Sequence, residues 1–133
     1  MVVTEIPRTI LVVEDEALIR MSTVASLEDA GLQVLEAANS AEALALLAGH
    51  AEISIMVTDV RMPGVMDGLA LVSRVQRDSP AIRAIVVSAN ATATDAYKAG
   101  AAKFISKPYL AHSVVQAVLS LIPDNQAPLG FAA

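Results

Sequence analysis

The feature that most constrains the fold is a regular alternation between short apolar runs and longer stretches with helical spacing. The runs are TILVV (9–13), LQVLEA (32–37), ISIMVT (53–58), AIVVS (84–88) and KFIS (103–106). An unbroken apolar run such as 53–58 indicates a strand that is covered on both faces, as in a parallel sheet. The alternation therefore predicts βα units joined by right-handed crossovers, with 53–58 as a central strand.

Each run is followed by a predicted helix. The first covers about 16–30, with Gly31 as its stop, and its apolar residues recur at helical spacing at Leu18, Met21, Val24, Ala25 and Leu27. Ser40 is the expected N-cap of the second helix, which Gly49 ends. The third helix is expected over 68–77.

The last two predicted helices differ in strength. Alanine and threonine dominate the segment between 89 and 100, which predicts a short, weak helix that ends at Gly100. The final helix is expected over 109–122, and its predicted core side comprises Leu110, Val114, Val115, Val118, Leu119 and Ile122.

These units predict an α/β fold with a doubly wound (βα)5 parallel five-stranded sheet, a flavodoxin-like three-layer sandwich. The chain has 133 residues, the usual size of one domain. We expect the domain to span 8–122 and the polar, proline-containing segment 123–133 to form a loose C-terminal tail, with no output domain.

Composition narrows the function classes. The net charge of −5 argues against direct binding of nucleic acid, which depends largely on lysine and arginine. The absence of cysteine excludes disulfides and thiolate sites. No stretch approaches the roughly 18 apolar residues of a membrane span, and the N-terminus lacks the apolar core of a signal peptide, so we expect a cytoplasmic protein without membrane binding.

Polar residues follow four of the predicted strands where each one ends. Glu14 and Asp15 follow the first, Asp59 ends the third, Ser88 ends the fourth and Lys107 follows the fifth. The carboxyl ends of parallel strands form the ligand-binding edge of such sheets. These carboxylates, hydroxyl and ammonium are therefore predicted to meet at one site.

Each residue also has a purely structural interpretation. Asp59 can form a turn, the acids at 14–16 can favour a helix N-terminus, Ser88 can cap a helix, and Lys107 can be a solvated surface lysine. Their joint placement at one edge favours the site over a set of separate coincidences.

Four motifs give this edge a family resemblance. In their order along the chain, they resemble the motifs of the receiver domains of bacterial two-component response regulators. The motifs are VVEDE (12–16), VTDVRMPG (57–64), VVSA (86–89) and ISKPY (105–109). The resemblance covers about residues 8–122. Among receiver domains, the chain resembles the stand-alone, single-domain type. This resemblance implies a phosphorelay switch that receives a phosphoryl group on an aspartate.

Three crowded carboxylates repel one another, and a divalent cation relieves that repulsion. Oxygen ligands alone favour Mg²⁺. By resemblance, Asp15, Asp59 and the backbone carbonyl of Arg61 would be direct ligands, and Glu14 would act mainly through water.

The resemblance also assigns roles in signalling. Asp59 would take a phosphoryl group from a sensor histidine kinase or a histidine phosphotransfer protein. Lys107, expected beside the carboxylates of the first strand, would neutralise charge and pair with Asp59 in the empty site, and Pro108 permits a cis bond there. Ser88 would then move toward the phosphoryl group and leave space for Phe104, which can also be a core residue.

The output would be a changed face toward an unknown downstream protein or a second copy in a homodimer. The chain differs from the family pattern in two places, and the second affects this partner-binding face. The loop 62–68 is about one residue longer than in chemotaxis-type receivers, and the span 88–100 is about one helical turn shorter than in the family. We predict that the weak segment 91–99 and the strand around Phe104 change most on phosphorylation.

Two other function classes remain open. A pseudo-receiver is an interaction module that never takes phosphate, and it usually lacks a site residue, whereas none is missing here. An aspartyl-phosphate phosphatase usually has a second acid two residues after its nucleophile, where this chain has Arg61. The residues thus favour a signalling switch rather than an enzyme.

Overall fold

The structure is a computed structural model that describes residues 9–122. The strands are β1 (Thr9–Val13), β2 (Gln33–Ala37), β3 (Ile53–Asp59), β4 (Arg83–Ser88) and β5 (Lys103–Ser106). The helices are α1 (Ala17–Asp29), α2 (Ser40–Gly49), α3 (Gly68–Asp78), α4 (Ala93–Ala99) and α5 (Ala111–Leu121). The predicted alternation is confirmed, whereas the expected loose tail at 123–133 lies outside the described residues.

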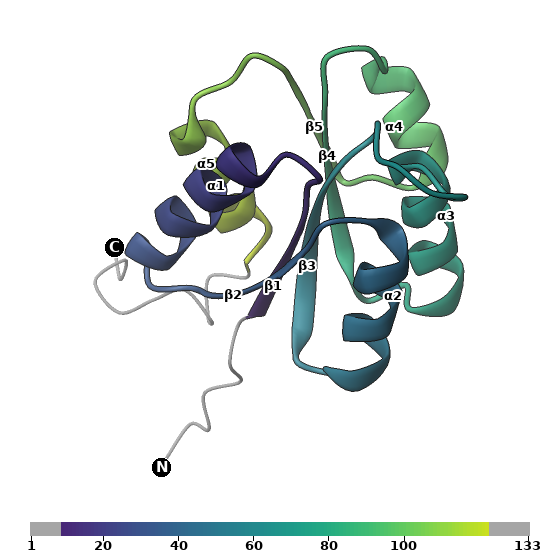
Figure 1. Ribbon diagram of the computed structural model, residues 1–133, viewed down its shortest axis with the longest axis horizontal. Coiled ribbons are helices and arrows are strands. Elements are labelled where there is room, and N and C mark those ends of the chain that lie inside the picture. The colour runs from purple at the N-terminus through teal and green to yellow at the C-terminus, as the bar shows by residue number, and fades with distance from the viewer. Residues whose placement is uncertain (1–8, 123–133) are drawn as a thin grey trace.

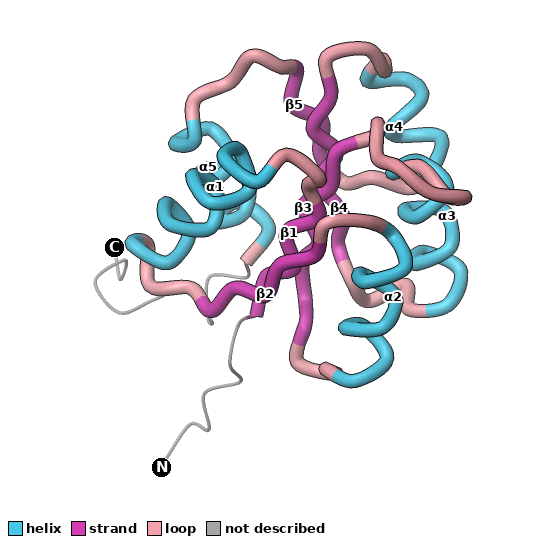
Figure 2. Tube along the Cα trace, in the orientation of Figure 1, coloured by secondary structure: helices cyan, strands magenta, loops and turns pink. Residues whose placement is uncertain are grey.

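All five strands are parallel, and their order is β2-β1-β3-β4-β5, with β3 in the middle as predicted. Helices α1 and α5 cover one face of the sheet, and α2, α3 and α4 cover the other (Figure 1). The strands form the central layer between them (Figure 2). This is the predicted doubly wound, flavodoxin-like sandwich.

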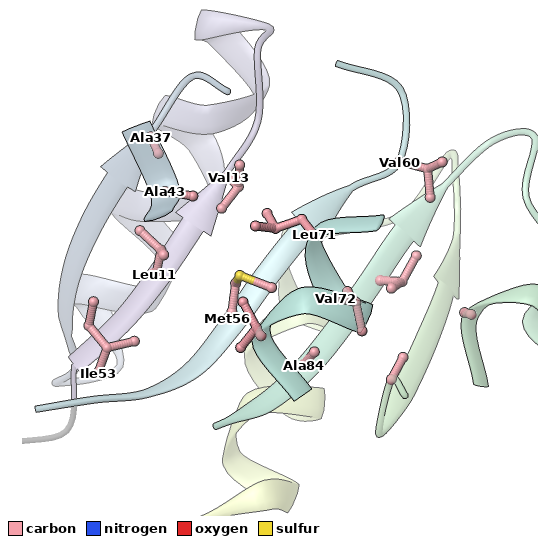
Figure 3. Packing of buried hydrophobic residues seen from close by; sticks show 14 residues of the cluster. Leu11, Val13, Ala37, Ala43, Ile53, Met56, Val60, Leu71, Val72 and Ala84 are labelled. Carbon is pink, nitrogen blue, oxygen red and sulfur yellow. The ribbon is translucent and has the colours of Figure 1, made fainter. Parts of the chain in front are cut away.

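The apolar runs are explained by two cores. Successive residues of a strand point to opposite faces of the sheet. Leu11 and Met56 therefore pack in the cluster beneath α2 and α3 (Figure 3), while Ile10 and Ile55 pack in the cluster beneath α1 and α5. With helices on both faces, most positions of the central strands are apolar, and the buried polar residues Thr58, Asp59 and Ser88 lie at the carboxyl ends of β3 and β4.

Side-chain caps begin α2, α3 and α4, whereas the N-cap residues of α1 and α5 make no side-chain cap hydrogen bond, and one predicted cap is wrong. The N-cap of α2 is Asn39, whose side chain accepts a hydrogen bond from the Glu42 amide; it is not Ser40. Ser40 is instead the first residue of α2 and donates its hydroxyl to the Met66 carbonyl at 2.9 Å. The predicted glycine stops at Gly31 and Gly100 are confirmed, since both have positive φ.

Three apolar residues predicted from helical spacing lie outside the core. Leu18 and Met21 on α1 are 82 % and 60 % exposed, and Leu110, which precedes α5, is 74 % exposed. Leu18 and Met21 lie on α1 as predicted, but they are on a part of its surface that no other element of the described chain covers, and Leu110 is the N-cap of α5 rather than a helical residue. No helix between residues 9 and 122 has both the length and the apolar character that a membrane span needs.

Candidate functional site

Three carboxylates meet at the carboxyl edge of the sheet. Glu14, Asp15 and Asp59 each offer an oxygen, and these oxygens lie within 4.8 Å of one another. Glu14 continues β1, with its amide bound to the Ala37 carbonyl at 3.0 Å, and Asp59 is the last residue of β3. Because β1 and β3 are neighbours, their ends bring the acids together, as the sequence predicted.

Two of these carboxylates are buried and share one ammonium. Glu14 is 5 % and Asp59 is 9 % exposed, whereas Asp15 is exposed. Lys107 Nζ donates to Asp59 Oδ2 at 2.9 Å and to Glu14 Oε1 at 3.1 Å. The predicted pairing of Lys107 with Asp59 is thus present in the structure.

Lys107 Nζ lies beside the Glu14 carboxylate that follows β1, as predicted. It comes from the far side of the sheet, because β5 is at the sheet edge, with β3 and β4 between it and β1. The Lys107 amide donates to the Ser88 carbonyl at 2.9 Å, which fixes its backbone beyond the end of β4. Its long side chain then spans the remaining distance, and the Lys107–Pro108 bond is cis.

Burial and pairing act in opposite directions on these groups. Burial raises the pKa of Glu14, although hydrogen bonds from the Glu16 amide and Lys107 work against this shift. Burial would lower the pKa of Lys107, but its hydrogen bonds to Asp59 and Glu14 outweigh burial and raise the pKa above its ordinary value. Lys107 therefore stays an ammonium at neutral pH.

Backbone contacts hold Asp59 in place. Its Oδ1 accepts from the Val60 amide at 2.7 Å, and its carbonyl accepts from the Thr58 hydroxyl at 2.8 Å. Gly68, the first residue of α3, donates its amide to the Val60 carbonyl at 2.8 Å. A Cβ at Gly68 would lie 1.9 Å from the Asp59 carbonyl oxygen, so only glycine fits there. The sequence predicted Gly68 as a helix start but not as a contact of Asp59.

The other predicted site residues surround this cluster. Arg61 is exposed and lines a hollow of about 440 Å³ together with Asp15, Val60, Met62, Pro63 and Asp67. Phe104 is partly buried against the core beneath α2, α3 and α4, in agreement with its core interpretation. Of the three clustered carboxylates, that of Asp15 lines this hollow.

Ser88 lies in the interior at the end of β4 and is 2 % exposed. Its Oγ accepts hydrogen bonds from the Asn90 and Ala91 amides at 3.1 and 3.0 Å. The cap of α4 is Thr92, so Ser88 shapes the loop before the helix and does not cap it. Among residues 9–122, the hydrogen bonds of Ser88 do not include the acidic cluster.

Comparison with known proteins gives the cluster its context. The model of the response regulator receiver domain matches residues 10–119. The DNA-binding transcriptional regulator NtrC of Escherichia coli is 33 % identical over 123 residues, covering 88 % of this chain and 26 % of NtrC. The regulator DctD of Rhizobium meliloti is 35 % identical over 111 residues, covering 81 % of this chain and 24 % of DctD. The chain thus spans about a quarter of these relatives.

Solved structures of receiver domains are also similar to this chain. A response regulator receiver protein from Pseudomonas putida matches with a TM-score of 0.78 and 29 % identity, covering 88 % of this chain and 98 % of that one. The chemotaxis protein CheY4 of Vibrio cholerae matches with a TM-score of 0.79 and 25 % identity, covering 87 % and 99 %. The sheet order, the acidic edge and the family match lead to one conclusion: this chain belongs to the response regulator receiver domains, which are signalling switches of two-component systems.

Proposed function

We propose that this chain is a phosphoacceptor switch in which Asp59 takes a phosphoryl group. The observation that carries the proposal is the position of Asp59 at the mouth of the central strand, between two further carboxylates and the Lys107 ammonium. Covalent catalysis by an aspartate needs a carboxylate that is both accessible from one side and surrounded by compensating charge.

The donor set fits Mg²⁺, which receiver domains bind at an acidic pocket. It offers oxygen ligands only, two of them on buried acids, next to an open hollow. We propose that Asp15, Asp59 and the Arg61 carbonyl hold the ion directly and that Glu14 acts mainly through water. When bound, the ion supplies positive charge that offsets the carboxylates and the incoming phosphoryl group.

The chemistry of the transfer is a displacement at phosphorus. An Asp59 carboxylate oxygen forms the new O–P bond, the P–N bond of a phosphohistidine breaks, and the electron pair leaves on the imidazole nitrogen. Lys107 is fixed within 2.9 Å of Asp59 Oδ2. Its ammonium is therefore in place to pair with a phosphoryl oxygen once Asp59 is modified.

The partners follow from this chemistry. A sensor histidine kinase or a histidine phosphotransfer protein would supply the phosphohistidine, in the cytoplasm. Phosphorylation adds about −1.5 to −2 charges and strong acceptor oxygens. Ser88 would donate its hydroxyl to one of these oxygens, and Phe104 would shift with it, so that the face around α4 and β5 changes for a downstream protein or a second copy.

The proposal is tested by intact-mass analysis after incubation with acetyl phosphate and Mg²⁺. We expect one phosphoryl adduct on the wild type and none on Asp59→Asn. Equal adduct on both proteins would assign the phosphoryl group to another residue. No adduct on a folded wild type that binds Mg²⁺ would favour the pseudo-receiver, and rapid release of inorganic phosphate without adduct would favour a phosphatase.

A second test addresses the metal. Asp15→Asn removes a proposed ligand and a charge, so we expect Mg²⁺ affinity to fall by at least about tenfold, whereas Glu14→Gln should cost less because its proposed contact runs through water. The chain has no tryptophan, so binding is followed by amide shifts in an NMR titration with MgCl₂. Equal affinities for the wild type and Asp15→Asn would refute this ligand set.

A further inference from the structure

Arg20 on α1 contacts the backbone of the acidic site. Its Nη1 donates to the Glu14 carbonyl at 2.7 Å, and its Nε donates to Glu36 Oε1 at 3.0 Å. The Arg20 side chain is 19 % exposed, although Glu36, on β2, is 49 % exposed. One planar guanidinium therefore joins the loop after β1 to the neighbouring strand.

This bridge completes the attachment of Glu14 to β2. The ladder of β1 ends at Val13, which pairs with Ala37 on one side and Thr58 on the other. The Glu14 amide still reaches the Ala37 carbonyl, at 3.0 Å, but its carbonyl takes a hydrogen bond from Arg20 instead. Both backbone groups of Glu14 are thus tied to β2, one directly and one through Arg20 and Glu36.

The Glu14 side chain depends on that backbone. Its Oε2 accepts from the Glu16 amide at 3.1 Å, and its Oε1 accepts from Lys107 Nζ at 3.1 Å. Asp15, the next residue, contributes the exposed carboxylate of the cluster. The Glu14 carbonyl and the Asp15 amide belong to one planar peptide, so a displacement of this peptide would shift the backbone that carries both acids.

We propose that Arg20 is a positioning residue for the acidic site, which fixes the peptide between Glu14 and Asp15 and thereby the carboxylates that bind Mg²⁺. The inference rests on the proposed function, because it takes the ion as the ligand of that site. A fork of N–H donors suits this task, since it holds a carbonyl and a carboxylate at the same time, whereas a lysine ammonium acts as a flexible point charge.

Two possible roles of Arg20, as a positioning residue or only as a nearby positive charge, predict different effects of its substitution on Mg²⁺ affinity. If Arg20 acted only as a nearby positive charge, Arg20→Met would bind Mg²⁺ more tightly, because a repulsive cation is removed, and Arg20→Lys would bind it unchanged. If Arg20 positions the acids, both variants bind more weakly. Residues that orient metal ligands typically change affinity by about 10–100-fold, and we expect about tenfold for Arg20→Met.

The experiment is an NMR titration of the full chain with MgCl₂, in the wild type, Arg20→Met, Arg20→Lys and Arg74→Met. Arg74 forms a comparable exposed pair with Asp78 at 2.7 Å on α3, so Arg74→Met is the matched control. We expect weaker binding in both Arg20 variants and wild-type affinity in the control. Should Arg20→Met fail to fold, Arg20→Lys, which keeps the charge, decides the question.

A second readout uses the protein without metal. The Glu16 amide is held by the Glu14 side chain, so its hydrogen exchange reports whether that side chain keeps its place. We expect faster Glu16 exchange in both Arg20 variants and no change in Arg74→Met, with exchange in the centre of β3 unaffected. This separates a local displacement from a general loss of stability, which would speed exchange everywhere.

Two results would overturn the inference while leaving the proposed function intact. One is unchanged or tighter Mg²⁺ binding in Arg20→Met and Arg20→Lys, together with a normal phosphoryl adduct on Asp59. The other is unchanged exchange at Glu16 in both variants. A wild type that binds no Mg²⁺ and takes no phosphoryl group would overturn the proposed function itself, and the inference with it.

Discussion

Two regions of the molecule are held by different kinds of contact. The first is the acidic site, which comprises Glu14, Asp15, Asp59 and Lys107. The second is the α4–β5 segment, which comprises residues 88–106. In the acidic site, two buried carboxylates meet one ammonium at 2.9 and 3.1 Å, and backbone amides bind the same acids. In the α4–β5 segment, α4 has 7 residues with Ala96 as its buried residue, and β5 is an edge strand without a fully buried position.

This difference supports the proposal that the acidic site receives the signal and that the α4–β5 segment transmits it. Charged, specific contacts hold the acidic site in one arrangement, which suits binding and chemistry. A 7-residue helix with one buried residue, next to an edge strand, predicts low local stability for the α4–β5 segment, which would make a second arrangement accessible to it. A switch needs such an element, since a ligand can shift only states that are close in energy.

The largest expected effect comes from removing the shared ammonium. Lys107→Met leaves Glu14 and Asp59 buried without a cation, which we expect to lower the free energy of unfolding by about 3 kcal/mol at pH 7, the scale for breaking a buried pair. Urea unfolding measures this. Mg²⁺ should restore more stability to the variant than it adds to the wild type, because the ion replaces the missing positive charge.

The stability that Lys107→Met loses should depend on pH in a predictable direction. The pKa of Glu14 is already raised by burial, and loss of Lys107 raises it further. A raised folded-state pKa means that the folded protein holds a proton which the unfolded chain has lost, so stability rises as the pH falls. The gap between wild type and Lys107→Met should therefore narrow from pH 7 toward pH 5. A gap that is constant or widens would argue against uncompensated buried charge.

A pair of glycine substitutions compares the two regions directly. A Cβ at Gly68 would meet the Asp59 and Val60 backbone, so we expect Gly68→Ala to cost about 2 kcal/mol or more, in the range of overpacked cores. A Cβ at Gly100 would lie 2.7 Å from Gln76 Cγ and 3.2 Å from Gln76 Cβ, so the Gln76 side chain, which donates to the Ile82 carbonyl, would have to move. With φ of +112° as well, Gly100→Ala should cost about 1–2 kcal/mol.

The two glycine variants should also differ in their effect on function. Gly68→Ala displaces Asp59, so the yield of the phosphoryl adduct should fall, whereas Gly100→Ala should leave the yield unchanged. Unfolding experiments and intact-mass analysis provide the two readouts. Similar losses of adduct in both variants would show that stability alone, and not the position of Asp59, controls the reaction.

The smallest expected effect is on the coupling between the two regions. With Mg²⁺ and beryllofluoride, a phosphoryl mimic, we expect hydrogen exchange to change most over 88–106. Ser88→Ala should reduce that change without altering Mg²⁺ affinity, because the proposed role of the hydroxyl is to bind the phosphoryl oxygen. The Ser88 Oγ also accepts two loop amides, so the variant should lose about 1 kcal/mol of stability.

Ser88→Thr is the matched control, because it keeps a hydroxyl at the same position. It should preserve both the loop hydrogen bonds and the exchange response. If the response were confined to the loops after β1 and β3, or if Ser88→Ala responded like the wild type, the output surface would have to be sought away from the α4–β5 segment.

The order and type of the elements were predictable from sequence, because each depends on local patterns. The alternation of apolar runs predicted the strands, and Gly31, Gly49 and Gly100 predicted helix ends. The rule that ligands bind at the carboxyl ends of parallel strands then predicted that Glu14 and Asp59 would lie together. That rule needs only chain direction, which the alternation of strand and helix already implies.

The tertiary structure decided what depends on distances between elements. Helical spacing could not show that Leu18 and Leu110 are exposed, because exposure depends on which neighbouring elements cover each position. Lys107 reaches the acids from the edge strand, across β4, through the length of its side chain. Gly68 lies against the Asp59 backbone, and Arg20 donates to the Glu14 carbonyl, so both contacts involve backbone atoms that carry no sequence signal of their own. Contacts to backbone are set by the packing of whole elements, and so they appear only once the chain is folded.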